Sequence, residues 1–224
     1  MSSIELKNIN KSYRTVDQTI NIFNDLSFKF HQNKSYAIMG VSGIGKSTLI
    51  NLISNLDFPT NGHILFNEFN LSHFNSEQNQ IFLNESVGLV FQEPNLINEL
   101  TVIENVMIKG FIKKRDLNYC KNFALELLKN VDLENKANEY PSNLSGGQQQ
   151  RVAICRAIFN KPQFLLADEP TGNLDEKTAK NIADLLFQFK NEWQMGLIIA
   201  THDKNLASLA DEILIIKDGK LERF

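Results

Sequence analysis

Nine residues between Gly40 and Thr48 limit the possible folds of this chain more than any other stretch. They read GVSGIGKST and match the phosphate-loop pattern G-x-x-x-x-G-K-[ST]. The apolar run 36–39 precedes them and helical periodicity follows from Leu49, so the pattern predicts a strand, a loop and a helix. Glycines let backbone N–H groups turn inward as an anion-binding nest, and the positive end of the following helix adds to that field.

The loop also carries side chains suited to a phosphate chain and its metal ion. Lys46 has the reach for terminal phosphates, and the Ser47 hydroxyl is expected to ligate magnesium. The alternative is a glycine-rich turn with a chance lysine, which the joint register of the glycines, the lysine and the hydroxyl disfavours. The candidate phosphate-binding residues are Gly40, Ser42, Gly43, Gly45, Lys46, Ser47 and Thr48.

Composition predicts an ordinary globular protein of one large domain, or of a domain with an insert. Of the 224 residues 42% are hydrophobic and 22% are charged. The net charge of −3 gives no argument for a nucleic-acid surface. Cys120 and Cys155 lack metal-ligand spacing and are expected to be free thiols in a reducing compartment. No signal peptide and no spanning run is evident, so we expect a soluble protein that meets a membrane only through a partner.

Strand-like and helix-like patterns alternate along most of the chain, which predicts an α/β fold with a parallel-sheet core. The helical middle, about 92–140, interrupts this alternation and is expected to be an inserted subdomain between core parts 1–91 and 141–224. The predicted strands are 4–6, 26–30, 36–39, 63–66, 86–91, 164–167, 197–200 and 213–216. Helices are predicted from Thr101 to a stop at Gly110, and over 116–131, 145–159 and 175–193.

Three of the buried strands are followed by residues suited to binding or catalysis: the phosphate loop, Asp168-Glu169 and Thr201-His202. In open α/β sheets ligands bind off the carboxyl ends of the strands, so these groups are expected to share one crevice. Asp168 is the expected magnesium-orienting carboxylate, with a helix cap or a surface acid as the alternative. Glu169 is a candidate for positioning or deprotonating a water, although as a lone residue it is equally an ordinary charged neighbour.

Three further positions are ambiguous when each is taken alone. His202 is more often a packed or solvated histidine than a catalytic one, and Gln92 is more often a polar loop residue. Tyr13 is either a partly exposed strand aromatic or a stacking platform for a nucleotide base.

The stretch 144–151, LSGGQQQR, resembles the signature of the nucleotide-binding subunits of ABC transporters, and the resemblance extends from Tyr13 to Gly219. It implies a P-loop NTPase (RecA-like) core with an N-terminal antiparallel β subdomain and an inserted α-helical subdomain. It also implies that Tyr13 stacks on the base, that Gln92 contacts magnesium and couples to the membrane subunit, and that Glu169 and His202 act at the γ-phosphate. The remaining implied nucleotide contacts are the signature residues Ser145, Gly146, Gly147 and Gln148, and Asp175 of the D-loop.

The resemblance further implies an ATPase that uses ATP and Mg²⁺ and works as a head-to-tail homodimer with two shared ATP molecules. The expected partner is an integral membrane permease, with the chain in the cytoplasm on the inner face of the membrane. The stretches 100–106 and 170–175 look most like the LolD/MacB/FtsE group, which implies lipoprotein release or the export of peptides or small molecules. The alternatives are an FtsE-like ATPase that signals to a cell-division complex and a soluble, non-transport ABC ATPase.

The segment 92–110 is rich in apolar residues, and two interpretations of it stay open. The residues are either part of the core of the insert or a groove for a short cytoplasmic helix of the membrane partner. The residues concerned are Leu96, Ile97, Leu100, Val102 and Ile103.

Overall fold

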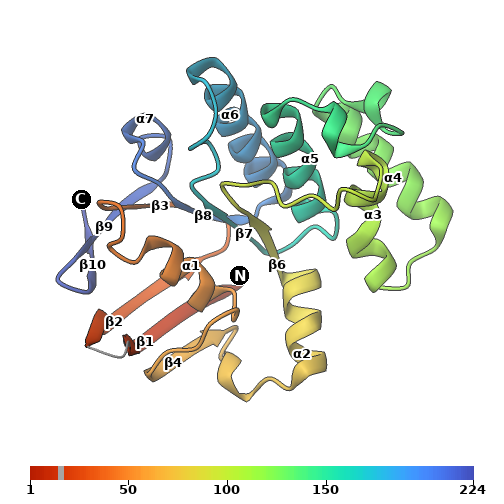
Figure 1. Ribbon diagram of the computed structural model, residues 1–224. Coiled ribbons are helices and arrows are strands. Elements are labelled where there is room, and N and C mark those ends of the chain that lie inside the picture. The colour runs from red at the N-terminus through yellow and green to blue at the C-terminus, as the bar shows by residue number, and fades with distance from the viewer. Residues whose placement is uncertain (15–17) are drawn as a thin grey trace.

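The computed structural model describes residues 1–14 and 18–224, and in this part of the chain the strands form a parallel and an antiparallel sheet (Figure 1). The parallel sheet has the strand order β10-β9-β3-β8-β7-β6, and only the β9–β10 pair in it is antiparallel. Its strands are β3 (Ser35–Met39), β6 (Val87–Val90), β7 (Phe164–Asp168), β8 (Gly196–Ala200), β9 (Glu212–Lys217) and β10 (Lys220–Arg223).

The antiparallel sheet has the order β2-β1-β4-β5 and is built from the N-terminal part of the chain. Its long strands run well beyond the short segments predicted from the sequence. Register shifts between Leu6 and Ser12 in the β1–β2 pairing break the alternation of apolar and polar residues, so the sequence pattern showed only part of each strand. The strands are β1 (Ser3–Arg14), β2 (Thr19–His31), β4 (Asn61–Phe66) and β5 (Phe69–Asn70).

Three of the predicted helices begin close to the predicted positions, each at a capping residue. Asp116, Ser145 and Asp175 each cap the helix that follows. Helix α2 was not predicted, although Asn75 and Gln78 form a capping box at its start. The helices are α1 (Lys46–Ile53), α2 (Ser76–Ile81), α3 (Val102–Ile112), α4 (Leu117–Asn130), α5 (Gly146–Ile158), α6 (Glu176–Trp193) and α7 (Lys204–Ala207). Single turns of other helix types are Leu71–His73, Phe82–Ser86, Glu134–Lys136 and Pro141–Asn143.

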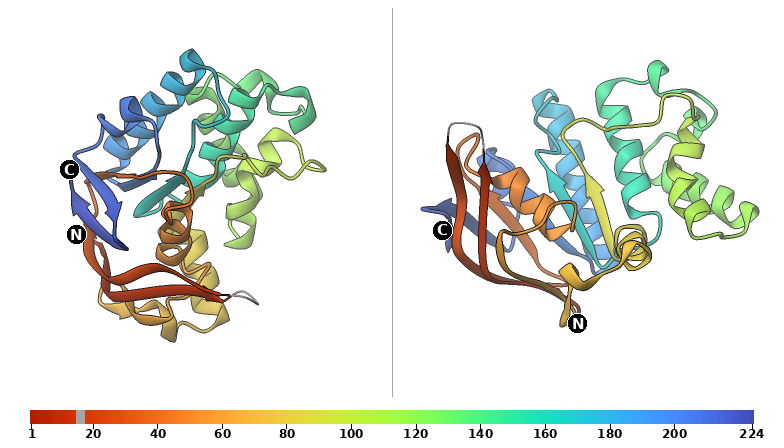
Figure 2. Two further views of the ribbon diagram at one scale, coloured as in Figure 1. Left: turned by 60° about the vertical axis from the view of Figure 1, so that its left-hand side comes forward. Right: turned by 60° about the horizontal axis from the view of Figure 1, so that its bottom comes forward.

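The parallel sheet is buried on both faces, and alternate residues of its strands enter two different cores. In β7, Phe164 and Leu166 pack with α1 and the antiparallel sheet, whereas Leu165 and Ala167 pack with α3 to α6. Helix α1 therefore lies between the two sheets, and α3 to α6 cover the opposite face (Figures 1 and 2). This sandwich fixes the direction in which α1 leaves the phosphate loop.

The predicted stop of a helix at Gly110 is wrong, because α3 continues to Ile112. Gly110 is buried, and a Cβ there would lie 2.6 Å from both the Cys120 sulfur and the Phe159 ring. The glycine allows α3 to approach α4 and α5 closely and does not end the helix. Both cysteines are buried free thiols, as the sequence indicated.

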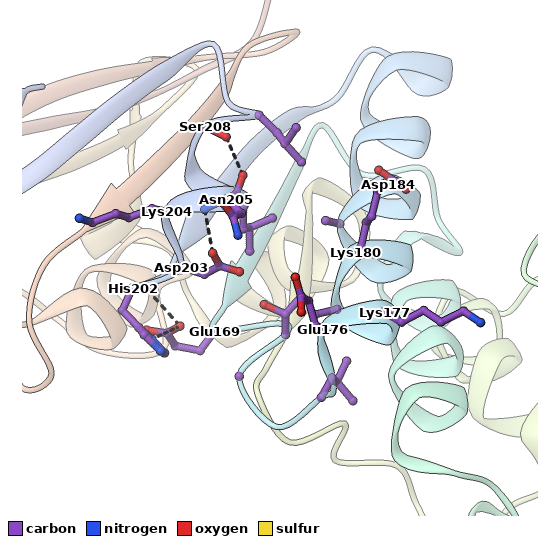
Figure 3. Close-up of a pocket in the computed structure, with 17 residues that line it drawn as sticks. Glu169, Glu176, Lys177, Lys180, Asp184, His202, Asp203, Lys204, Asn205 and Ser208 are labelled. Carbon is purple, nitrogen blue, oxygen red and sulfur yellow. Dashed lines mark hydrogen bonds and ion pairs between the residues drawn. The ribbon is translucent and has the colours of Figure 1, made fainter.

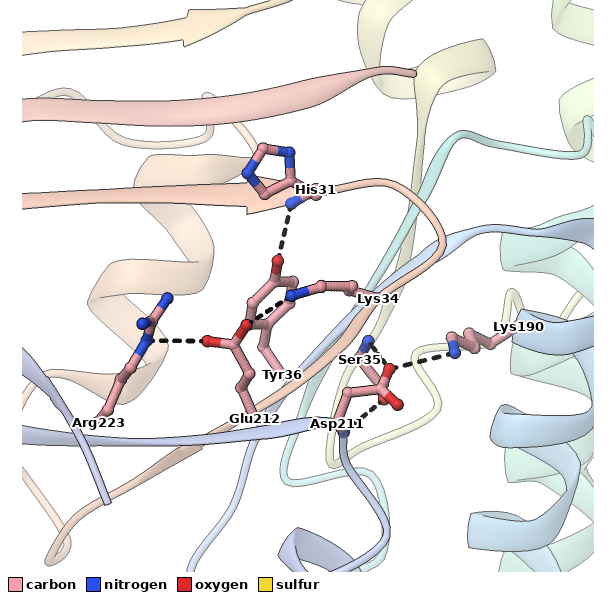
Figure 4. A network of polar contacts seen from close by, with 8 residues as sticks. All are labelled: His31, Lys34, Ser35, Tyr36, Lys190, Asp211, Glu212 and Arg223. Atoms are coloured by element: carbon pink, nitrogen blue, oxygen red, sulfur yellow. Dashed lines mark hydrogen bonds and ion pairs between the residues drawn. The ribbon is translucent and has the colours of Figure 1, made fainter.

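A polar network ties the amino ends of β3 and β9 together at the edge of the sheet away from the phosphate loop (Figure 4). The Ser35 N–H and hydroxyl both donate to Asp211 Oδ2 at 2.7 Å, and Lys190 of α6 reaches the same carboxylate at 3.3 Å. Glu212 binds Lys34 at 2.8 Å, which aligns the start of β9 with β3. We assign this network a structural role, because the phosphate loop and the candidate catalytic residues lie at the other end of the strands.

Candidate nucleotide-binding and catalytic site

The phosphate loop leaves the carboxyl end of β3 and opens directly into α1. Gly43 and Gly45 have φ values of 79° and 114°, a left-handed backbone that favours glycine. A Cβ on Gly45 would also lie 2.5 Å from Ile22, so the position excludes larger residues on two grounds. Helix α1 has no side-chain cap, which leaves the N–H groups of its first turn available for an anion.

Lys46 is 7% exposed and its ammonium group is folded back over the loop. The Nζ atom donates to the carbonyl of Gly40 at 3.0 Å and to that of Val41 at 3.5 Å. It also lies 3.3 Å from Glu169 Oε1, which joins the end of β3 to the end of β7. A cation therefore stands at the mouth of the loop, where a phosphate chain would gain most from it.

Asp168 ends β7 beside the phosphate loop, and its carboxylate lies close to the Ser47 side chain. Within the described residues its Oδ1 atom is buried and has no hydrogen-bond partner. Burial raises the pKa of Asp168; the Ser47 side chain opposes this, the Glu169 charge adds to it, and the Lys46 charge opposes it least. An orphaned, buried carboxylate oxygen is costly in the unliganded protein and suits a site that takes a cation.

Glu169 adopts a left-handed backbone with φ 46°, which is unusual for a residue other than glycine. Its N–H donates to the Ala200 carbonyl at 2.8 Å and so holds this conformation. The turn sends the side chain away from Asp168 and toward His202, whose Nδ1 lies 2.9 Å from Glu169 Oε2 (Figure 3). Strain of this kind, stabilised by its surroundings, is common at functional sites.

The structure thus brings the ends of three parallel strands into direct contact through side chains. Lys46 after β3, Glu169 after β7 and His202 after β8 form one continuous chain of polar contacts. His202 is largely exposed, whereas Glu169 is mostly buried. A cleft of about 1150 Å³ between α6 and α7 opens beside Glu169 and His202, so solvent can reach the carboxylate (Figure 3).

Gln92 lies after β6, and its amide is linked to the loop that follows Glu169. Its Nε2 donates to Asn173 Oδ1 at 3.0 Å, and a Cβ on Gly172 would lie 2.9 Å from the same nitrogen. Gln92 therefore lies against the segment that follows Glu169, and its contact with Asn173 was not predicted from the sequence.

Tyr13 projects from the end of β1 and is 40% exposed. Its hydroxyl donates to Asp57 Oδ2 at 2.7 Å, and the Lys11 ammonium lies 4.6 Å from the centre of its ring. Lys11 also binds Asp57 Oδ1 at 2.7 Å, so one carboxylate holds both residues. Burial raises the pKa of Asp57, but hydrogen bonds from Lys11, Tyr13 and the Phe58 N–H outweigh it and the net pKa is lowered.

Neither Lys11 nor Asp57 was predicted from the sequence to be a site residue. Lys11 stands two residues before Tyr13, so strand geometry places both on one face and offers a weak signal. Asp57 is 44 residues from Tyr13, and no local pattern connects them.

The signature residues are placed at the start of α5. Ser145 caps the helix and forms a closed capping box with Gln148, with contacts of 2.9 and 3.4 Å. Gly146 is exposed, and a Cβ there would make only an ordinary contact with Leu174 at 3.9 Å, whereas a Cβ on Gly147 would lie 2.3 Å from Thr178 Cγ2 of α6. Asp175 caps α6 by accepting the Thr178 N–H at 3.0 Å. The signature therefore meets the start of α6, and these contacts do not join it to the phosphate loop of the same chain.

A phosphate loop, a metal-suited carboxylate and a second acid at the carboxyl ends of strands of one parallel sheet define a P-loop nucleoside triphosphate hydrolase. A model of the family described as "ABC transporter" matches residues 23–172, and the chain belongs to that family. In the described part of the chain no helix has the length and apolar character needed to cross a bilayer.

Relatives and solved structures agree with this assignment. The chain is 37% identical to the "Lipoprotein-releasing system ATP-binding protein LolD" of Cytophaga hutchinsonii over 93% of this chain and 94% of the relative. It is 39% identical to the "Uncharacterized ABC transporter ATP-binding protein MJ0796" of Methanocaldococcus jannaschii over 98% and 95% of the two chains. The dimeric post-hydrolysis structure of the MJ0796 cassette with ADP and Pi matches at a TM-score of 0.90 and 38% identity, over 98% of this chain and 97% of that one.

These comparisons confirm the predicted fold class and the predicted activity. The chain is an ABC-type ATPase with a parallel-sheet core, an antiparallel β part and a set of helices. The subdomain limits at 91 and 141 stay a prediction, and α5 packs against both α3 and α6.

Proposed function

We propose that this chain is the motor subunit of a lipoprotein-releasing or exporting ABC transporter, in which two copies close head to tail around two ATP molecules. The observation that carries the proposal is the chain of contacts from Lys46 through Glu169 to His202, at the ends of three parallel strands. The relatives named LolD and the dimeric solved structures of MJ0796 support the transporter class and the dimer.

In this proposal Lys46 binds the terminal phosphates together with the N–H groups of the phosphate loop. Glu169 accepts a proton from the attacking water. The oxygen of that water forms a bond to the γ-phosphorus, while the bond between the γ-phosphorus and the oxygen bridging it to the β-phosphate breaks. The products are ADP and phosphate, and the proton leaves through the solvent-exposed cleft. His202 holds Glu169 in place at 2.9 Å and binds the departing phosphate.

The residues near Asp168 fit a magnesium ion. Asp168 Oδ1 is buried with no partner in the described residues, the Ser47 hydroxyl is adjacent, and Gln92 would supply an amide oxygen. Hard oxygen ligands of this kind suit Mg²⁺, which usually keeps water and phosphate oxygens as its other ligands. When bound, the ion neutralises charge on the β- and γ-phosphate oxygens.

The second half of the nucleotide site is proposed to come from Ser145, Gly146, Gly147 and Gln148 of the partner copy. Gly146 supports this because it is exposed at the helix start and crowded by no side chain, so that a phosphate of the partner's ATP can approach the backbone. Two to four hydrogen bonds to the γ-phosphate, each worth about 1.5–3 kcal/mol, match the roughly 5.5 kcal/mol needed to switch a dimer from mostly open to mostly closed.

A separate membrane permease is proposed to dock near the segment 92–110, which places the chain at the inner face of the membrane. Val102 and Ile103 are core residues, so the groove interpretation does not hold for them. Ile97 is 38% exposed, and the buried Asn105 side chain clamps its backbone with contacts of 2.8 and 3.0 Å. Ile97 is therefore the member of this segment best placed to meet a partner helix.

The test uses Glu169→Gln in the presence of ATP and Mg²⁺. The variant should bind ATP, lose about 10²–10⁴-fold of its hydrolysis rate and elute as a dimer in size-exclusion chromatography. The matched control is Glu192→Gln, an exposed acid near the far end of α6, which should hydrolyse ATP at the parent rate. A Glu169→Gln protein that turns over normally, or that stays monomeric with ATP and its membrane subunit, would overturn the proposal.

A further inference from the structure

The turn that joins α3 to α4 carries an exposed cluster of apolar and basic side chains that the ATPase site does not use. Phe111, Ile112, Leu117 and Tyr119 are 41%, 59%, 58% and 43% exposed. Four lysines and arginines and one aspartate lie in the same stretch, 111–121, which we call the α3–α4 tip. Exposed apolar side chains gathered in one short stretch mark a contact surface more often than scattered ones do.

The tip is an ordered projection. The Lys114 and Arg115 N–H groups donate to carbonyls of the last turn of α3 at 2.9 and 3.0 Å, and close the turn. Asp116 then caps α4 by accepting the Tyr119 N–H at 2.9 Å. Figures 1 and 2 place this turn at the periphery of the molecule, on the side away from the antiparallel sheet.

The base of the tip is anchored in the interior. The Lys109 ammonium donates to the Val87 carbonyl at 3.0 Å, and the Asn84 and Asn160 amides both donate to the Lys109 carbonyl at 3.2 and 3.1 Å. The exposed side chains are therefore held outward by a fixed helix end and are not exposed by fraying.

The cations of the tip are arranged around its apolar side chains. Arg115 lies over the Tyr119 ring, 5.0 Å from its centre, and Lys113 pairs with Glu85. Within the described residues Lys114 and Lys121 form no ion pair and are exposed. Lys121 follows Leu117 by four residues, so a free cation and an exposed apolar side chain share one face of α4.

This combination fits an anionic lipid surface. The chain as a whole has a net charge of −3, so a locally positive tip is complementary to an anionic surface and contrasts with the rest of the molecule. Aromatic and aliphatic side chains among flexible lysines are typical of protein surfaces that lie at the headgroup level of bilayers. The apolar side chains enter the headgroup region, and the long lysine side chains extend to the lipid phosphates. A projecting turn can rest on a flat bilayer, whereas a protein partner would need a groove and acids to receive it.

We propose that the α3–α4 tip docks on the anionic surface of a lipid bilayer. The inference does not depend on the proposed transport function, because lipid binding is measured without ATP and without a permease. Electrostatic attraction of this kind acts within the Debye length of about 8–10 Å at physiological salt, so the contact operates only when the tip lies at the surface.

The test is flotation of the full chain with vesicles of phosphatidylcholine alone or of phosphatidylcholine mixed with phosphatidylglycerol. We expect at least about tenfold more bound protein with phosphatidylglycerol, and a decrease on adding salt. Lys114→Glu with Lys121→Glu should abolish the phosphatidylglycerol dependence. Ile112→Ser with Leu117→Ser should lower binding to the mixed vesicles while leaving the effect of salt in place.

Matched controls separate the tip from bulk charge and bulk hydrophobicity. Lys217→Glu with Lys220→Glu makes the same charge change on the β9–β10 hairpin, and Phe69→Ser removes an apolar side chain that is 70% exposed on β5. Both should bind vesicles as the parent does, and all variants should keep the parent ATPase rate, which shows that they fold.

Three results would overturn the proposal. One is equal or absent binding of the parent to the two kinds of vesicle. Another is unchanged vesicle binding by the Lys114→Glu, Lys121→Glu protein, or an equal loss of vesicle binding in the Lys217→Glu, Lys220→Glu control. The third is a chain that ignores vesicles but loses co-purification with its membrane subunit when the tip is changed, which would make the tip a protein contact.

Discussion

Two glycine-containing loops lead into helices in this protein, and the fold prepares them in different ways. The phosphate loop enters α1 with left-handed glycines and no side-chain cap. The signature loop enters α5 with a closed capping box between Ser145 and Gln148. The first helix start leaves its N–H groups available, whereas in the second the capping box satisfies the N–H groups of Ser145 and Gln148 with side chains of the same chain.

The difference teaches how one chain can carry two unequal halves of a nucleotide site. The phosphate loop has Lys46 and the free N–H groups in place without a partner. The signature loop presents the open backbone of Gly146, while Gly147 is used to pack α5 on α6. A single copy is thus expected to bind nucleotide through the first loop, and the second loop is expected to matter only in the dimer.

The largest effect is expected for Lys46→Met. Hydrogen bonds to charged groups are worth about 1.5–3 kcal/mol, so the affinity of the monomer for ATP should fall about 10- to 150-fold. Gly146→Ala, on the signature side, should leave that affinity unchanged. Isothermal titration calorimetry on dilute protein measures both, and equal losses in the two variants would remove the asymmetry between the loops.

Next in size is the cost of Gly147→Ala to folding. The new Cβ would lie 2.3 Å from Thr178 Cγ2, and overpacking of this kind costs about 1–3 kcal/mol. Gly146→Ala has no such contact and should stabilise α5 by up to about 1 kcal/mol, because alanine favours helix. Urea unfolding compares them, and Thr178→Ser should rescue Gly147→Ala by removing the clashing methyl group. Failure of the rescue would mean that Gly147 is required for another reason.

A smaller effect is expected for Ser145→Ala. Loss of an N-cap residue costs about 0.5–2 kcal/mol, so the free energy of unfolding should fall by about 1 kcal/mol. Ser42→Ala in the phosphate loop is the control and should not change stability, because Ser42 is exposed and α1 has no side-chain cap. Guanidinium unfolding of both proteins measures the difference. A similar loss in the control would contradict the idea that only α5 is capped by a side chain.

The smallest effect is expected for Asp57→Ala. This variant tests whether Tyr13 belongs, with the phosphate loop, to the half of the nucleotide site that a single copy provides. Loss of the 2.7 Å contact frees the Tyr13 ring, so KM for ATP should rise about 3- to 10-fold with kcat unchanged. The affinity for tripolyphosphate, which has no base, should stay the same. Steady-state kinetics and competition by tripolyphosphate measure the two quantities. An equal loss of affinity for ATP and for tripolyphosphate would mean that Asp57 supports the fold and does not act on the nucleotide base through Tyr13.

Much of the architecture could be predicted because its signals are local. Capping residues such as Asp116 and Asp175 lie beside the helices that they start, and buried strands show as apolar runs. Gly110 was misread because its role depends on Cys120 and Phe159, which are distant in sequence or on another helix. Asp57 was missed for the same reason, since its link to Tyr13 exists only after β1 and α1 pack together.

The sequence by itself determined the buried strands of the parallel sheet, the starts of the capped helices α4 to α6, the phosphate loop, and the two acids at the end of β7, because each depends on residues that are neighbours along the chain. Only the tertiary structure decided that Lys46 meets Glu169, that Glu169 meets His202, and that Gly147 packs on Thr178. The physical reason is that strand pairing and helix packing bring together side chains from distant parts of the sequence, and the energies of those contacts leave no mark in a local pattern.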